Sequence, residues 1–123
     1  MVAFRTARAA IVANDFELKN QQRDVLYTEL EIITAATAIH YINDVLSATT
    51  DGDRMHWLSE CYNFVAALRY NIPERRSVTL AEVDQILNQD IGENFWETTS
   101  SGLNNAKDFL STRFGLDSVK DNL

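Results

Sequence analysis

The sequence is poor in the residues that interrupt helices or cross-link small folds. It contains one cysteine, one proline and four glycines among 123 residues. A single cysteine, Cys61, excludes an internal disulfide and a zinc site built from cysteines alone. Because proline and glycine are scarce, the chain has few breaks, which favours long helices over many short strands.

Basic residues are also scarce, with eleven lysines and arginines against eighteen acids and a net charge of −7. Nucleic-acid binding requires clustered bases, and the one tight cluster, Arg75 and Arg76, lies beside Glu74. We therefore expect no nucleic-acid partner and no docking on an anionic membrane face. Since no run approaches the roughly 18 apolar residues of a transmembrane helix, we also expect no membrane insertion of this domain.

The length fits one domain, and a chain of this size buries roughly two thirds of its unfolded surface. We expect a single helical domain over residues 1–123. The N-terminal segment carries arginines but lacks the apolar stretch and cleavage site of a secretion signal. The chain is therefore either cytosolic or a domain of a longer exported precursor, and composition leaves both open.

Helical periodicity dominates the first half of the chain. We predict a short helix over residues 3–13, stopped by Asn14 and Asp15, and an unbroken helix over 15–47. The long helix has a second apolar stripe, Leu26, Leu30 and Ile33, so we expect neighbours on both sides of it. The small residues from Thr34 to Ala38 would let another helix approach closely. Its first stripe comprises Val25, Ile32, Ala35, Ala36, Ile39, Ile42 and Leu46.

Start and stop signals define the second half. We predict a helix over 54–70 capped by Asp53, a helix opened by a capping box of Thr79 and Glu82, and a last helix ended by Gly115. We expect Thr98 or Thr99 to cap that last helix, and Phe95 and Trp96 to pack onto the bundle from the turn before it. The stripe predicted for 54–70 is Trp57, Leu58, Cys61, Phe64, Val65 and Leu68. The predicted fold is all-α, a bundle of about five helices around a long central second helix.

Two histidines stand four residues before an acid, His40 before Asp44 and His56 before Glu60. This spacing places each pair on one helix face, where it could form a ligand site or a structural polar contact. Stronger metal signatures are missing, because neither HExxH nor a Glu-x-x-His pair occurs. We therefore predict no metal site, no cofactor and no catalytic residue, and keep these four side chains as a candidate ligand or structural polar site.

Glu60 is the most informative of the four, because it lies at the edge of a buried stripe. A buried carboxylate needs a partner, and Arg69, Arg8 and Tyr41 are the candidates for one. Cys61 lies in the middle of the same stripe, so we expect it to act as a small apolar residue rather than a nucleophile.

Four segments carry a family resemblance: "TAIHYIND", "HWLSECYNFVAALRYNIPERR", "EVDQILNQDIGENFWETT" and "GLNNAKDFLSTRFGLDSVKDNL". Over about residues 3–123 the chain resembles the C-terminal part of an uncharacterised bacterial family of envelope lipoproteins, whose genes often lie beside imelysin-like, iron-regulated proteins. The resemblance implies a lipid-anchored, exported precursor, a periplasmic or surface location, and work in iron or haem acquisition. The imelysin-like Gly-x-His-x-x-Glu motif is absent here, because Ala38 and Arg54 stand two residues before the histidines.

Three functions remain open from the sequence. The first is a non-enzymatic helical module of an envelope protein that binds a partner protein or an iron-linked ligand. The second is a metal-binding domain that uses Glu60 with His56 or His40. The third is a scaffold that oligomerises through the small residues Ala35 to Ala38. The sequence leaves the oligomeric state itself open.

Overall fold

The chain folds as an all-α protein, as its sequence predicts. In the computed structural model, the described residues 2–123 form helices and helical turns joined by loops, without a β-strand. The α-helices of this part are α1 (Val2–Val12), α2 (Phe16–Ser47), α3 (Asp51–Ala67), α4 (Leu80–Gln85) and α5 (Ser100–Phe114). The shorter elements are the 3₁₀ turns η1 (Leu68–Tyr70) and η3 (Lys120–Asn122) and the π-helical segment η2 (Ile86–Ile91).

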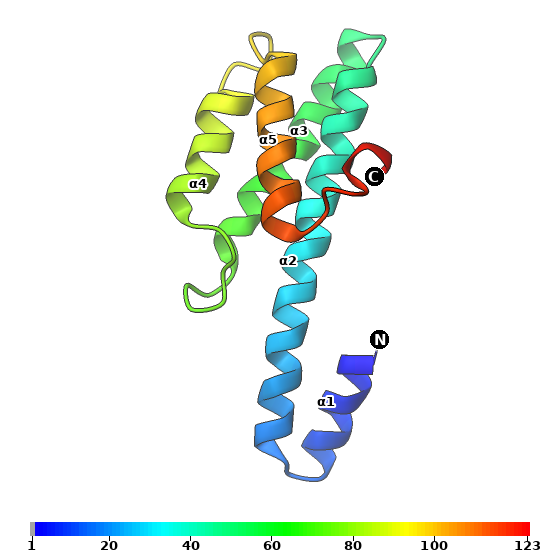
Figure 1. The fold of residues 1–123 in the computed structure, drawn as a ribbon, viewed down its shortest axis with the longest axis vertical. Coiled ribbons are helices and arrows are strands. Elements are labelled where there is room, and N and C mark those ends of the chain that lie inside the picture. The colour runs from blue at the N-terminus through cyan, green and yellow to red at the C-terminus, as the bar shows by residue number, and fades with distance from the viewer. Residues whose placement is uncertain (1) are drawn as a thin grey trace.

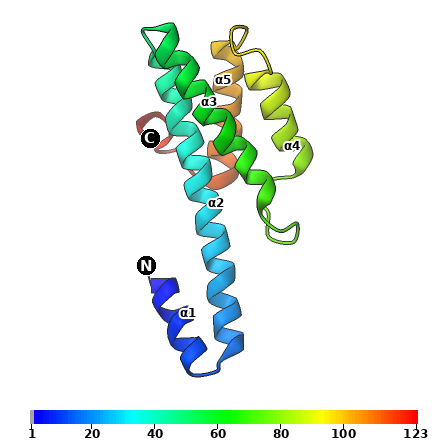
Figure 2. The same ribbon diagram turned by 180° about the vertical axis from the view of Figure 1, so that it is seen from behind.

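Helix α2 runs the length of the molecule and belongs to two parts of it (Figures 1 and 2). Its C-terminal half packs against α3 and α5, and α4 with η2 completes that group. Its N-terminal half projects away from the group and packs against α1, which runs antiparallel to it. We call residues 2–30 the hairpin and residues 31–123 the body.

The turn of the hairpin follows from two polar residues. Asn14 has a φ of 56°, the left-handed conformation that often ends a helix. The Asp15 carboxylate then accepts a hydrogen bond from the backbone N–H of Leu18 at 3.0 Å and caps α2. The backbone N–H of Asp15 donates to the carbonyl of Ala10 at 2.8 Å. The predicted stop at Asn14 and Asp15 is confirmed.

The start of α3 differs from the prediction. Thr50, not Asp53, is the N-cap, and its hydroxyl oxygen accepts a hydrogen bond from the backbone N–H of Asp53 at 3.1 Å. Asp51 and Gly52 therefore lie inside the first turn rather than at the tip of a loop. The carboxylates of Asp51 and Asp53 stabilise the helix from this position, because negative charge is favoured at the positive N-terminal end of a helix.

The two apolar stripes of α2 differ in how far they are buried. Ala35 and Ile39 of the first stripe are fully buried, and so is Ala38 beside them, so the small residues do allow close helix approach. Val25 and Leu46, at the two ends of the first stripe, are exposed. Ala35 and Ala38 are covered by the same chain, whereas Ala36 is half-buried. Two of the three alanines in this run are therefore not available for the oligomerisation hypothesis.

The second stripe was predicted to contact neighbours, but Leu30 and Ile33 are 52% and 58% exposed. The prediction is confirmed at Leu26, which is half-buried where α1 packs on α2. Leu30 and Ile33 line the groove between the start of α1 and α2 and stay exposed.

The core lies entirely in the body. Leu58, Cys61 and Val65 are buried as predicted, while Trp57 and Phe64 are half-buried at its edge. Phe95 packs on Tyr62 with 5.8 Å between ring centroids, but its neighbour Trp96 is 70% exposed and does not pack as predicted. The core residues are Ala35, Ala38, Ile39, Ile42, Val45, Leu58, Cys61, Val65, Leu68, Val78, Val83, Ile86, Leu87, Ile91, Leu103, Ala106 and Leu110.

The second half keeps its predicted caps and adds one unpredicted element. Thr79 and Glu82 form the capping box of α4, and Thr99 caps α5 with a bond from the backbone N–H of Gly102. Gly115 ends α5 in the left-handed conformation, as predicted. The π-helical segment η2 then packs so closely on α5 that a Cβ at Gly102 would lie 2.1 Å from the carbonyl oxygen of Asp90. Glycine is therefore required at that contact.

Candidate functional site

The first predicted pair forms, on the surface of the body. His40 Nε2 lies 3.4 Å from an Asp44 carboxylate oxygen, and the two side chains are 51% and 32% exposed. The His40 ring also lies against Tyr41, with 5.4 Å between ring centroids. Exposed pairs of this kind contribute little free energy, typically well under about 1 kcal/mol. The contact fits a surface polar interaction.

The second predicted pair lies on α3. His56 is exposed and Glu60 is half-buried. Arg69, a partner expected for Glu60, pairs instead with Asp84 of α4, and Arg8 lies on α1. Within residues 2–123, Glu60 forms no ion pair or side-chain hydrogen bond with any of its three candidate partners, Tyr41 included. A half-buried carboxylate keeps contact with water, so it tolerates the lack of an ion pair.

The candidate residues do not gather into a metal centre. Within residues 2–123, no three side chains of His, Cys, Asp or Glu lie close enough together to hold a metal ion. The four candidate side chains therefore do not converge on one site: His40 lies beside Asp44 on α2, and His56 and Glu60 lie on α3. This geometry gives the hypothesis of a metal site at Glu60 no support.

The thiol of Cys61 is poorly reactive. Cys61 is fully buried in the core, and burial raises its pKa to about 12. A thiol with that pKa carries almost no thiolate near neutral pH, and the thiolate is the nucleophilic form. Cys61 therefore acts as a small apolar residue, as its position in the stripe indicates.

A buried carboxylate that sequence reasoning missed lies on α2. Glu31 is only 5% exposed, and it accepts hydrogen bonds from Ser77, at 3.0 Å from the backbone N–H and 2.6 Å from the hydroxyl. The available signal was its position four residues before Ala35, on the buried stripe. Glu31 therefore anchors the loop between η1 and α4 onto α2.

The arginines of that loop also form ion pairs or hydrogen bonds within the chain. Arg75 forms an ion pair with Asp24 at 2.7 Å, and Arg76 donates to the carbonyl of Arg69 at 3.1 Å. From α5, Arg113 donates to the carbonyl of Ser77 at 2.7 Å. The basic cluster noted in the sequence is thus a structural clamp for this loop rather than a free basic patch.

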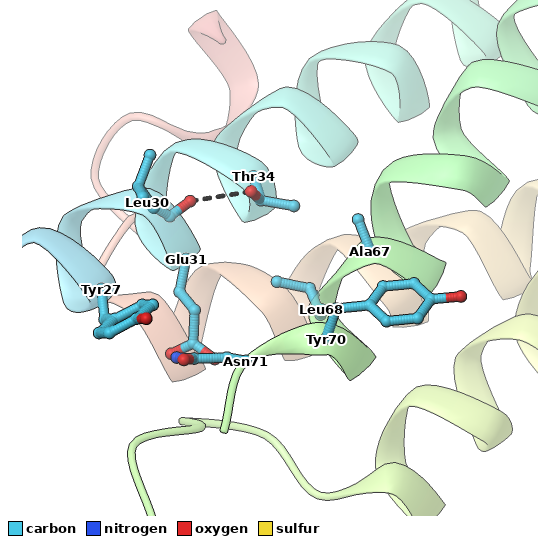
Figure 3. A pocket seen from close by; sticks show the side chains of 8 residues that line it. All are labelled: Tyr27, Leu30, Glu31, Thr34, Ala67, Leu68, Tyr70 and Asn71. Atoms are coloured by element: carbon cyan, nitrogen blue, oxygen red, sulfur yellow. Dashed lines mark hydrogen bonds between the residues drawn. The ribbon is translucent and has the colours of Figure 1, made fainter. Parts of the chain in front are cut away.

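A small crevice opens between α2 and η1 beside this clamp (Figure 3). Its volume is about 170 Å³, below the roughly 300 Å³ at which pockets for small organic ligands begin. Glu31 and Asn71 point toward each other at its floor, and Tyr70 is 85% exposed at its edge. Its lining is Tyr27, Leu30, Glu31, Thr34, Ala67, Leu68, Tyr70 and Asn71. The crevice fits a few waters or one small group.

The largest concentration of unburied apolar side chains lies on the hairpin and the adjoining turn of α2. Eight of the fourteen exposed large apolar residues lie within residues 2–33. A groove of about 430 Å³ runs between the start of α1 and α2, lined by Val2, Ala3, Phe4, Val25, Leu26, Glu29, Leu30 and Ile33. We define the hairpin surface as the eight exposed apolar residues Val2, Phe4, Ile11, Val12, Phe16, Val25, Leu30 and Ile33.

Two free arginines lie beside this surface. Arg5 and Arg8 flank a second groove on α1, of about 420 Å³, with Ala9, Val12 and Ala13. Neither forms an ion pair or a side-chain hydrogen bond within residues 2–123. Every other lysine and arginine contacts an acid, a carbonyl or an aromatic ring of the same chain. The hairpin surface thus combines exposed apolar side chains with unpaired positive charge.

None of the helices in residues 2–123 combines the length and the apolar composition that a membrane crossing requires.

Comparison with known proteins identifies the family of the chain but no reaction or ligand for it. No curated protein and no solved structure matches it. The model of one protein family, described as a domain of unknown function (DUF4856), matches residues 1–117, which is nearly the whole chain. The chain therefore belongs to the DUF4856 family.

Proposed function

We propose that this chain is a non-enzymatic helical module of a bacterial envelope protein, and that it binds a protein partner through the hairpin surface. The observation that carries the proposal is the exposure of eight large apolar side chains on two helices that project from the body. Soluble monomers rarely expose contiguous apolar patches larger than a few hundred Å² unless the patch binds something.

The composition of the surface favours a protein as the occupant. Phe4 and Phe16 are 60% and 59% exposed, and aromatic side chains are enriched among the residues that dominate binding at protein interfaces. Helical grooves are typically filled by the apolar face of another helix. Arg5 and Arg8 add a requirement for carboxylates at the edge of that face, so the expected partner is an apolar helical surface bordered by acids.

The non-enzymatic part of the proposal draws on the candidate residues. Cys61 is a buried thiol whose pKa burial raises to about 12, which suits packing rather than nucleophilic attack. His40 and His56 are exposed on the body, and the crevice beside Glu31 is too small for most substrates.

The cellular part of the proposal rests on the family resemblance of the four sequence segments. Envelope lipoproteins encoded beside iron-regulated neighbours would place the module in the periplasm or at the cell surface, in iron or haem acquisition. A protein-binding module fits that setting, since uptake systems work as assemblies.

Site-specific photo-crosslinking in cells tests the binding role. A photoreactive amino acid replaces Val12, which is 79% exposed on the hairpin, or Trp96, which is 70% exposed on the body and serves as the control. We expect a discrete protein adduct at position 12 and none at position 96. Equal adducts at both positions, or none at position 12, would contradict a binding role for the hairpin.

Growth under iron limitation tests the link to iron separately. Loss of the gene is expected to slow growth when haem is the sole iron source, and the wild-type gene is expected to restore it. A Phe4→Ser, Ile11→Ser double variant should restore growth less well. Unchanged growth without the gene would remove the iron link and leave the binding role intact.

A further inference from the structure

We infer that the partner of the hairpin surface is a second copy of this chain, and that two hairpins pair about a two-fold axis to form a four-helix bundle. The inference rests on the proposed function, because it names the protein that the hairpin surface binds.

The shape of the hairpin suits pairing with itself. α1 and the N-terminal half of α2 already lie antiparallel, and they extend beyond the body (Figure 1). The loop before α4 reaches α2 through the ion pair between Arg75 and Asp24. Two such hairpins placed face to face give four neighbouring helices with alternating directions, a common bundle architecture. A two-fold axis lets each copy use the same apolar residues, so both faces are covered at once.

The available area meets what a dimer needs. Two helices of about 10 Å diameter, and a rise of 1.5 Å per residue over residues 16–33, give a face of roughly 20 by 25 Å. Two such faces bury on the order of 1,000 Å² in total, near the lower bound for a specific interface. Because the face carries large apolar side chains such as Phe4, Ile11 and Leu30, its area is of the kind that stabilises association.

The charge distribution singles out the hairpin as the part where copies can meet. The body, residues 31–123, carries seven bases and fourteen acids and therefore the entire net charge of −7. The hairpin carries four bases and four acids and is neutral. Two bodies repel each other, whereas two hairpins do not, and the projection of the hairpin keeps the acidic bodies apart.

Sedimentation equilibrium over a concentration series tests the inference on the 123-residue chain. We expect a reversible monomer–dimer equilibrium, whose dissociation constant rises at least tenfold in the Phe4→Ser, Ile11→Ser double variant. Trp96→Ser, which removes an equally exposed aromatic from the body, should leave the dissociation constant unchanged.

Cysteine cross-linking provides a second readout that does not depend on a destabilising variant. The native thiol, Cys61, is fully buried, so a single introduced cysteine reports on its own position. Under mild oxidation Ile11→Cys is expected to give disulfide-linked dimers, and Trp96→Cys is not.

Each outcome decides the inference. A chain that stays monomeric at millimolar concentration overturns it, as does a dimer that survives the hairpin changes. If the monomer still forms an adduct with a different protein at position 12 in cells, the self-pairing is wrong and the proposed function stands. If neither self-association nor a cellular adduct occurs, both fall.

Discussion

The hairpin and the body are built from helices of similar quality but differ in what covers them. In residues 2–30 the only buried side chain is Ala10, whereas the core cluster of the body runs from Ala35 to Leu110. Helix α2 crosses from one part to the other without a break. The difference therefore does not come from helix formation. It comes from tertiary packing, which only the body supplies.

The comparison shows where the stability of the monomer is located. A two-helix hairpin buries little apolar surface, and short helices are marginal in water without packing. The body buries seventeen apolar residues contributed by helices distant in sequence. The hairpin is therefore the part with free energy left to gain from a partner.

Two isoleucines six residues apart on α2 give the sharpest contrast. Ile39 is fully buried and Ile33 is 58% exposed. Ile39→Ala removes packing and leaves a cavity, so we expect a loss of about 2–5 kcal/mol in the free energy of unfolding. Ile33→Ala should change it by less than about 0.5 kcal/mol at concentrations where the chain is monomeric. Urea denaturation measures both, and similar losses would mean that the hairpin surface is packed as tightly as the core.

Two glycines test the close contact between α5 and η2. Gly102→Ala places a Cβ 2.1 Å from the carbonyl oxygen of Asp90, a backbone atom that cannot rotate away. We expect a cost of about 1–3 kcal/mol from this overpacking. Gly52→Ala on the exposed first turn of α3 meets only the Thr50 hydroxyl at 3.9 Å and should be neutral or slightly stabilising. Thermal unfolding of the two variants compares them directly, and a neutral Gly102→Ala would argue against this helix contact.

Two glutamates test the anchor between α2 and the loop before α4. Glu31→Gln replaces a carboxylate that accepts hydrogen bonds from the Ser77 backbone and hydroxyl, and should cost about 1–2 kcal/mol. Glu29→Gln, two residues away on the exposed hairpin, is the matched control and should stay within about 0.5 kcal/mol. Hydrogen exchange of the loop amides reports the local effect. Unchanged protection in Glu31→Gln would show that the anchor is dispensable.

Acidification tests the clamp between α4 and α5. The hydrogen bond from Arg113, helped by the backbone N–H of Thr79, lowers the pKa of Glu82 from 4.5 to about 2. Because this pKa is lower in the folded state, the ionised carboxylate stabilises the fold fully above pH 4.5, and that contribution disappears as the pH falls toward 2. The stability gap between wild type and Glu82→Gln should therefore shrink over that interval. A gap independent of pH would contradict the clamp.

Local signals explain how much of the fold could be predicted. Asn14 and Asp15, the Thr79–Glu82 box and Gly115 act within one helical turn, so their roles could be identified in the sequence and are confirmed. The cap of α3 was misplaced because Thr50 and Asp53 are both good capping residues within the same turn. The π-helical segment η2 gave no local signal, since it depends on the contact between Asp90 and Gly102.

The candidate site shows the same limit. The spacing of His40 and Asp44 predicted a contact that exists at 3.4 Å, because residues four apart share a helix face. Arg69 was one of three candidate partners for Glu60, but that arginine pairs with Asp84, which lies fifteen residues beyond it in sequence. Glu31 was overlooked for the same reason, because its partner Ser77 is 46 residues away.

The helices, their polar stops and the acidic net charge can be read from the sequence, because they depend on neighbours along the chain and on composition. The burial of one apolar stripe rather than the other depends on tertiary packing. Residues such as Ile33 and Ile39 have equal hydrophobicity, and their burial depends on whether another helix reaches them. The body provides that helix for Ile39 and leaves the hairpin surface open, which is where a partner can bind.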